Sequence, residues 1–304
     1  MGVSMKFTDL DQYLFGQGTN YEVYKKLGAH PAEIRKKKGI LFDVWAPHAA
    51  EVYVIGTFND WNETANPMRR LEPAGIGIFE AFIPKAELGD LYKYLIITPD
   101  GRKLYKADPY ANYAEVRPGT ASRIADIEHF KWTDDKWMDK RKQTEDVYAE
   151  PMAIYEVHPG SWRKKDDGTE DGFYNYRELA VELAAYVKEM GYTHVELMPV
   201  MEFNDNSSWG YNTNFYMAPD KVYGTPDDMK RFVDECHKRG MAVILDIVFN
   251  QSDWLAPWYQ MYGGVADNPF YNATAPHDYS VLNDWNQDNP IVRRHWKDVL
   301  TYWL

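Results

Sequence analysis

Apolar residues follow two different periods along this chain, and the change falls near residue 151. Between residues 40 and 106, short apolar runs alternate with turn-forming residues, which is typical of β-strands. After residue 151, short apolar runs alternate with longer segments in which apolar residues recur every three to four positions, as in helices. The pattern therefore predicts a β-sandwich followed by a parallel α/β unit.

The expected sandwich is preceded by residues 7–30, where the apolar spacing predicts two short amphipathic helices with a break at Gly16 to Gly18. A Pro99-Asp100-Gly101 turn between two apolar runs predicts a β-hairpin. We assign residues 1–125 to this part, and we interpret the charged segment 126–150 as a linker or a surface crossover without a binding role. The expected strands are 40–45, 51–56, 78–83, 92–98 and 102–106.

Residues 151–304 contain three expected strands, each followed by an expected helix. The run from Ala242 to Gln251 is nearly unbroken and apolar apart from Asp246, which predicts a strand buried on both faces. No Gly-x-Gly-x-x-Gly sequence follows a strand, which disfavours a dinucleotide-binding fold. The pattern favours the first three βα units of a TIM (β/α)8 barrel. The strands are 153–157, 194–200 and 242–249, and the helices are 176–190, 226–239 and 290–303.

The first two of these helices have explicit start sequences. Asn175 is followed three residues later by Glu178, which is the spacing of a capping box. Thr225 and Asp228 have the same spacing, with Pro226 in the first helical position. These residues fix where the helices are expected to begin.

Polar and aromatic residues follow the expected strands, at the edge where parallel α/β folds bind ligands. Asp246 lies at the end of the third strand. An ionised carboxylate there costs stability unless it is paired with another group or has a functional role, so we favour a functional role. Tyr211 lies in a loop rich in Asn, Ser and Gly, close to Trp209, which favours a binding role. For His158, after the first strand, a structural role is favoured, and Gln251 ends the third run.

The composition of the chain restricts which kinds of molecule it is expected to bind. The formal net charge of −12 argues against nucleic acid, whereas an aromatic content of 15% is compatible with sugar binding, large cores and interfaces alike. The single cysteine, Cys236, excludes an internal disulfide and is expected to be buried. No metal-ligand spacing and no membrane-length apolar segment occur, so we expect no metal, no cofactor, no membrane partner and a cytoplasmic location.

Several motifs resemble bacterial 1,4-α-glucan branching enzymes of glycoside hydrolase family 13. Some are similar to the opening strands of that family's catalytic barrel, and others to its N-terminal carbohydrate-binding-like sandwich. The resemblance runs almost from end to end of the chain, and it is specific because the motifs occur together. The matching segments are 27–31, 58–62, 153–162, 186–200, 208–211 and 223–226.

The resemblance implies a retaining transfer reaction, in which an α-1,4-glucan such as glycogen or amylose is cleaved and joined to a glucan 6-hydroxyl. Retention requires two carboxyl groups about 5 Å apart. In the family these groups follow barrel strands four and five, which are expected beyond Leu304. Neither catalytic carboxylate is therefore expected here, and we expect this chain to be inactive by itself.

The same resemblance assigns substrate-binding roles to Tyr211, Asp246, Gln251 and Trp209. Tyr211 matches the tyrosine that stacks on the sugar beside the scissile bond, and Asp246 matches the aspartate that organises this subsite. Gln251 departs from the family because histidine is usual there, and glutamine hydrogen-bonds but carries no charge. Asn250 is usual in amylases, where it can ligate calcium, but one carbonyl oxygen makes no calcium site.

Two alternatives to a branching enzyme remain open. Asn250 and Gln251 favour a related family 13 α-amylase or debranching hydrolase. The expected lack of both catalytic carboxylates favours a non-catalytic glucan-binding protein. Product analysis separates the first two, because only branching creates α-1,6 linkages.

Overall fold

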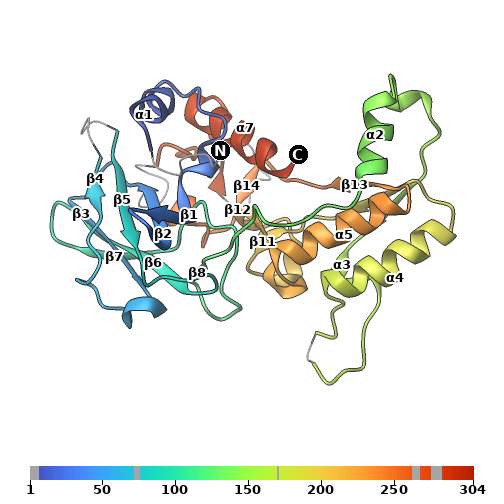
Figure 1. The fold of residues 1–304 in the computed structure, drawn as a ribbon, viewed down its shortest axis with the longest axis horizontal. Helices are drawn as coiled ribbons and strands as arrows, with labels where there is room; N and C mark the ends of the chain where they lie inside the picture. Colours follow the sequence, from blue (N-terminus) through green and yellow to red (C-terminus); the bar gives the residue numbers. More distant parts are fainter. Residues whose placement is uncertain (1–6, 72–75, 170, 262–267, 275–282) are drawn as a thin grey trace. The chain divides into compact units, whose positions relative to one another are not determined.

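The computed structural model describes residues 7–71, 76–169, 171–261, 268–274 and 283–304 (Figure 1). The chain divides into two compact units. The first unit comprises residues up to 126 together with 212–218 and 249–304, and the second comprises 127–211 and 219–248. Among the described residues, no helix is both long and apolar enough to cross a membrane.

The first unit contains the predicted β-sandwich. One antiparallel sheet has the order β1-β2-β5-β4, and the other has β3, β6 and β7 in order, with β8 paired to β6 (Figure 1). Phe42, Val54, Phe79 and Tyr94 are among the buried residues between them. All five expected strands are confirmed. The bounds are β1 Gly28–Ile34, β2 Lys37–Trp45, β3 Glu51–Gly56, β4 Arg69–Arg70, β5 Ile78–Ile83, β6 Leu91–Ile97, β7 Lys103–Lys106 and β8 Ser122–Arg123.

The prediction of a second helix within residues 7–30 is wrong. The first is present as α1 Asp9–Gly16, capped by Thr8, but the second is only a 3-10 turn at Val23–Lys25. The chain then enters β1, in which Gly28 pairs with Asp43 of β2. This long-range pairing overrides the local helical spacing, which is a weaker determinant of structure.

The last expected helix is confirmed as α7 Pro290–Trp303, with Asn289 accepting a hydrogen bond from the Ile291 amide as its N-cap. It packs on residues of the first unit. Asp298 accepts a bond from the Tyr24 amide at 3.4 Å, and the Trp303 ring donates to the Tyr216 carbonyl at 2.8 Å. The two compact units therefore do not coincide with the expected segments 1–125, 126–150 and 151–304. Whether these segments fold as separate domains stays a prediction. The first unit also contains four shorter elements from the second half of the chain. They are β12 Thr213–Pro219, whose last residue belongs to the second unit, β14 Gln251–Ser252, α6 Pro257–Met261 and β15 Asn283–Asp284.

The second unit contains a parallel sheet in the order β13-β10-β9, with β9 Ile154–Val157, β10 His194–Leu197 and β13 Ala242–Leu245. Helices α4 Tyr176–Glu189 and α5 Pro226–Lys238 lie side by side (Figure 1) and begin with the two predicted capping boxes. Cys236 is fully buried, as predicted. The shorter elements are α3 Pro159–Trp162 and β11 Met201–Phe203.

The expectation that the third strand is buried on both faces is wrong. All four residues of β13 are only half-buried. Val243 and Leu245 pack on the core beneath the helices, and the strand is at one edge of the sheet, with β10 as its partner. Among the described residues of this unit, no further strand pairs with β13 on its other side, and the residues of β13 keep some contact with solvent.

The segment 126–150, interpreted above as a linker or surface crossover, contains regular structure. It contains helix α2 Asp135–Gln143 and a 3-10 turn at Val147–Ala149. The Thr133 amide donates to Asp234 of α5 at 2.7 Å, and Asp134 contacts the His237 ring nitrogen at 2.6 Å. These contacts attach the start of α2 to α5 within the second unit.

Candidate functional site

Tyr211 and Asp246, two predicted binding residues, are in direct contact in the second unit. The Tyr211 hydroxyl donates a hydrogen bond of 2.7 Å to Asp246 Oδ2. This bond, with a smaller contribution from burial, raises the pKa of Tyr211 to about 12 and keeps the phenol protonated. The Asp246 amide continues the parallel ladder by donating to the Leu197 carbonyl at 3.0 Å, which fixes the carboxylate just past the end of β13.

Two further carboxylates lie on the same face of the sheet. Glu156 of β9 pairs with Glu196 of β10, on the face opposite the buried Val195 and Leu197. The charges of both glutamates also raise the Tyr211 pKa, so they lie near its hydroxyl. Glu196 was not among the predicted site residues, although the alternation of polar and apolar residues over 194–197 already places it on the face opposite Val195 and Leu197. This face accepts hydrogen bonds and suits a neutral, hydroxyl-rich ligand better than an anion.

Trp209 is an exposed aromatic side chain held by a constrained turn. Its φ is +55°, in the left-handed region that bulky residues rarely adopt, and 54% of its surface is exposed. A Cβ on Gly210, which has φ +89°, would lie 2.1 Å from the Pro199 carbonyl oxygen, so only glycine fits there. Strained backbone of this kind clusters at functional sites.

His158 supports Trp209. The two rings stack with centroids 5.7 Å apart and planes 25° apart, and His158 Nδ1 lies 3.0 Å from Ser161 Oγ. Burial, and secondarily the charge of Lys164, lowers the His158 pKa, so the imidazole is neutral at pH 7. These contacts agree with the structural role that the sequence favoured for His158.

Gln251, the fourth predicted binding residue, belongs to the first unit. It pairs with Asp284 across β14 and β15, and its side-chain oxygen accepts a bond from Asn250 at 2.8 Å. Its carbonyl accepts a bond from the Tyr216 hydroxyl at 2.9 Å. Its role in substrate binding stays a prediction. In the part of the chain that the structure describes, no three His, Cys, Asp or Glu side chains are grouped to hold a metal ion.

The sandwich carries an open depression of about 490 Å³ that our sequence analysis missed. Trp61 and Tyr105 line it, with 39% and 49% of their surfaces exposed. Glu63 accepts hydrogen bonds from the Tyr105 hydroxyl and from Lys103. Lys93 donates to Thr120 Oγ1 at 2.7 Å on the same lining. Aromatic faces beside fixed polar groups form a surface suited to sugar rings.

Two family models match the chain: carbohydrate-binding module 48 (isoamylase N-terminal domain) over residues 26–111, and the alpha amylase catalytic domain over residues 158–272. The 1,4-alpha-glucan branching enzyme of Butyrivibrio fibrisolvens is 54% identical over 238 residues, which cover 78% of this chain and 37% of that protein. The branching enzyme of Bacillus caldolyticus is 48% identical over 299 residues, which cover 98% of this chain and 44% of that protein.

A solved structure gives the same architecture. The putative alpha amylase from Salmonella typhimurium has a TM-score of 0.67 and 25% sequence identity, over 91% of this chain and 41% of that chain. The present chain thus spans less than half the length of each of these three proteins.

Proposed function

We propose that this chain, which is similar to 1,4-alpha-glucan branching enzymes over most of its length and matches the models of their sandwich and α-amylase-type barrel, supplies the glucan-binding part of a branching reaction. In this reaction an α-1,4-glucan is cleaved and the released chain is joined to a 6-hydroxyl. The observation that carries the proposal is the Tyr211–Asp246 pair in a chain that is 48% identical to a branching enzyme over almost its whole length.

Tyr211 and Asp246, which are in contact in the second unit, are proposed to hold one sugar ring together. The Tyr211 ring offers an aromatic face, and its hydrogen bond fixes the orientation of the Asp246 carboxylate. Asp246 then accepts hydrogen bonds from sugar hydroxyls, which is a charge-assisted interaction. Trp209 is proposed to offer an aromatic face to another glucose unit of the glucan. Gln251, in the first unit, is proposed to bind substrate through an uncharged amide where the family has histidine.

The bond-breaking groups are proposed to lie on strands that follow residue 304 in the family. A retaining enzyme needs one carboxyl group to attack the sugar and a second to protonate the leaving oxygen. Asp246 is assigned to substrate binding, because it matches the family aspartate that organises the subsite. The reaction therefore requires later barrel strands in addition to this chain.

The depression on the sandwich is proposed as a second place where α-glucan binds. Trp61 and Tyr105 supply aromatic faces there, and Lys93 and Glu63 supply a donor and an acceptor. This role agrees with the match to a carbohydrate-binding module over residues 26–111. A glycogen-like substrate inside the cell fits a cytoplasmic protein with a single cysteine.

Product analysis on a chimera tests the proposed reaction. The chimera joins residues 1–304 to the residues of the Bacillus caldolyticus enzyme that follow the aligned region. Branching produces new α-1,6 linkages, whereas a hydrolase, the alternative that Asn250 and Gln251 favour, produces reducing ends. Affinity electrophoresis in amylose tests the sandwich. Trp61→Ala should abolish most of the retardation, and Trp254→Ala, which removes a more exposed tryptophan outside the depression, should not change it.

A further inference from the structure

The second unit contains a cavity of about 260 Å³ beside the Trp209–His158 stack. Ser161, Lys164, Asp171 and Asn206 line it together with these two rings. Its volume lies just below the roughly 300–1,000 Å³ of sites for drug-sized ligands, so it suits a single sugar ring.

The lining of this cavity matches a neutral polyhydroxyl ligand. Trp209 provides an exposed aromatic face, and Ser161 and Asn206 provide a hydroxyl and an amide. Lys164 lies 4.1 Å above the Phe173 ring and donates to the Asp171 carbonyl at 2.7 Å, so its charge is already engaged. One cation, one carboxylate and a neutral imidazole favour neither an anion nor a cation.

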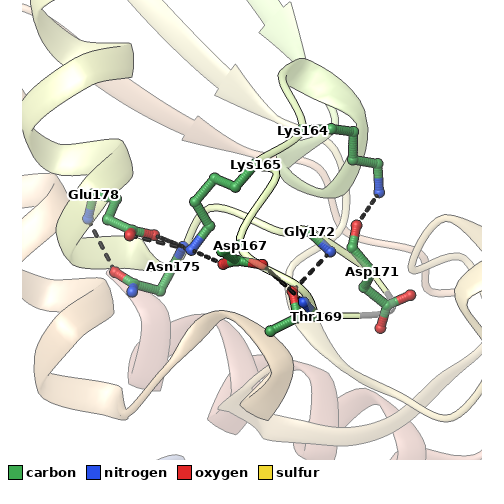
Figure 2. Close-up of polar contacts among 8 residues, drawn as sticks. All are labelled: Lys164, Lys165, Asp167, Thr169, Asp171, Gly172, Asn175 and Glu178. Carbon is green, nitrogen blue, oxygen red and sulfur yellow. Dashed lines mark hydrogen bonds and ion pairs between the residues drawn. The ribbon is translucent and has the colours of Figure 1, made fainter.

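Residues 163–169 and 171–175, which form the outer wall of the cavity, are held in place by a polar network (Figure 2). Lys165 forms ion pairs with Glu178 at 3.0 Å and with Asp167 at 3.1 Å. Glu178 also closes the capping box of α4, so Lys165 attaches the wall to the start of that helix (Figure 2). Gly172 has φ +58°, and a Cβ there would lie 2.6 Å from the Lys165 carbonyl oxygen. A wall fixed in this way is formed before any ligand binds, which favours affinity.

We propose that this cavity, which we call the Trp209 pocket, binds one glucose unit of an α-1,4-glucan separately from the Tyr211–Asp246 pair. The inference rests on the proposed glucan substrate. Trp209 supplies the stacking face, and Ser161 and Asn206 hydrogen-bond the hydroxyl groups. Lys165 is a positioning residue, because it holds the wall and does not line the cavity. The pocket raises the affinity for long glucans and takes no part in bond breaking.

The test is calorimetric titration with maltoheptaose in a Trp61→Ala background, which removes the sandwich depression. The titration is carried out on the 304-residue chain and repeated on the chimera. If the second unit folds poorly in one of these two proteins, the other still gives the binding constant. Ser161→Ala with Asn206→Ala should weaken binding about tenfold, from the loss of two neutral hydrogen bonds. Trp209→Ala should weaken binding at least as much, and Trp132→Ala, an exposed tryptophan outside the lining, should not weaken it.

Lys165→Met separates positioning from binding. We expect weaker maltoheptaose binding with unchanged near-ultraviolet circular dichroism, and partial rescue by Lys165→Arg. In the chimera, the Ser161→Ala/Asn206→Ala double variant and Lys165→Met should raise KM for amylose by a larger factor than they lower kcat, whereas Tyr211→Ala should lower kcat.

The failure of this inference differs from the failure of the proposed function. If maltoheptaose binding is lost in Tyr211→Ala but unchanged in the pocket variants, the Trp209 pocket is refuted and the proposed function stands. If neither protein binds maltoheptaose, both are refuted. Equal binding of cellohexaose, or displacement of maltoheptaose by inorganic phosphate, would also overturn the α-glucan assignment of the pocket.

Discussion

The hydrogen bond between Tyr211 and Asp246 is open to a direct energetic test. Tyr211→Phe keeps the ring and removes only the hydroxyl that donates to the carboxylate at 2.7 Å. Hydrogen bonds to charged groups contribute about 1.5–3 kcal/mol. Both side chains contact solvent, so the lower end of this range applies, about 1.5 kcal/mol. That free energy corresponds to roughly a tenfold change in rate.

The assay is a double-mutant cycle on kcat/KM of the chimera. Tyr211→Phe should lower kcat/KM about tenfold, and Asp246→Asn should lower it at least about a hundredfold, as the loss of a charged group in a catalytic cleft commonly does. The double variant should be close to Asp246→Asn alone, which gives a coupling of about 1.5 kcal/mol. Tyr211→Ala removes the ring as well and should cost about 1 kcal/mol more. Melting temperatures should stay near that of the parent.

Two results would refute this reasoning. Strictly additive effects would mean that the hydroxyl does not act through Asp246. Unfolding of Tyr211→Ala would mean that the ring belongs to the core. Tyr13→Phe, which removes an exposed phenol on α1, is the matched control. As a second readout, NMR titration should show that Asp246→Asn lowers the Tyr211 pKa from about 12 toward its ordinary value.

Three further predictions concern other parts of the chain. Limited proteolysis should cut first within residues 126–150, which contain no buried residue in α2; primary cuts within strands 40–106 would contradict the boundary. Burial raises the Asp298 pKa to about 7, so its protonated form is favoured in the folded state and the free energy of unfolding should fall as pH rises from about 4 to 7, by at most about 4 kcal/mol. Asp298→Asn should flatten this dependence in urea titrations. Gln251→His, which restores the family residue, should raise the kcat of the chimera; a lower kcat would show that this chain is adapted to glutamine.

Local patterns in the sequence predicted the regular elements well. Asn175 with Glu178 and Thr225 with Asp228 mark helix starts because capping is a contact between residues close in sequence. The turn at Pro99 to Gly101 likewise requires only neighbouring residues. The sequence predicted only that Tyr211 and Asp246 lie near the same edge of the sheet. The hydrogen bond between them is seen only in the structure.

Features that depend on distant partners were missed. The segment after Lys25 enters β1 because β2 supplies its hydrogen bonds, and no local pattern contains that information. The burial of β13 was overestimated because an apolar run does not reveal how many strands flank it. The depression at Trp61 and the wall held by Lys165 likewise depend on residues brought together from separate segments.

The central claim is that these residues contribute the glucan-binding part of a branching enzyme. The most direct measurement is proton NMR of amylose after incubation with the chimera, together with a reducing-end assay. We expect new α-1,6 anomeric signals without a matching rise in reducing ends. We expect neither product from residues 1–304 alone or from the Bacillus caldolyticus part alone. A chimera that releases reducing ends without α-1,6 linkages, or a 304-residue chain that cleaves amylose by itself, would contradict it.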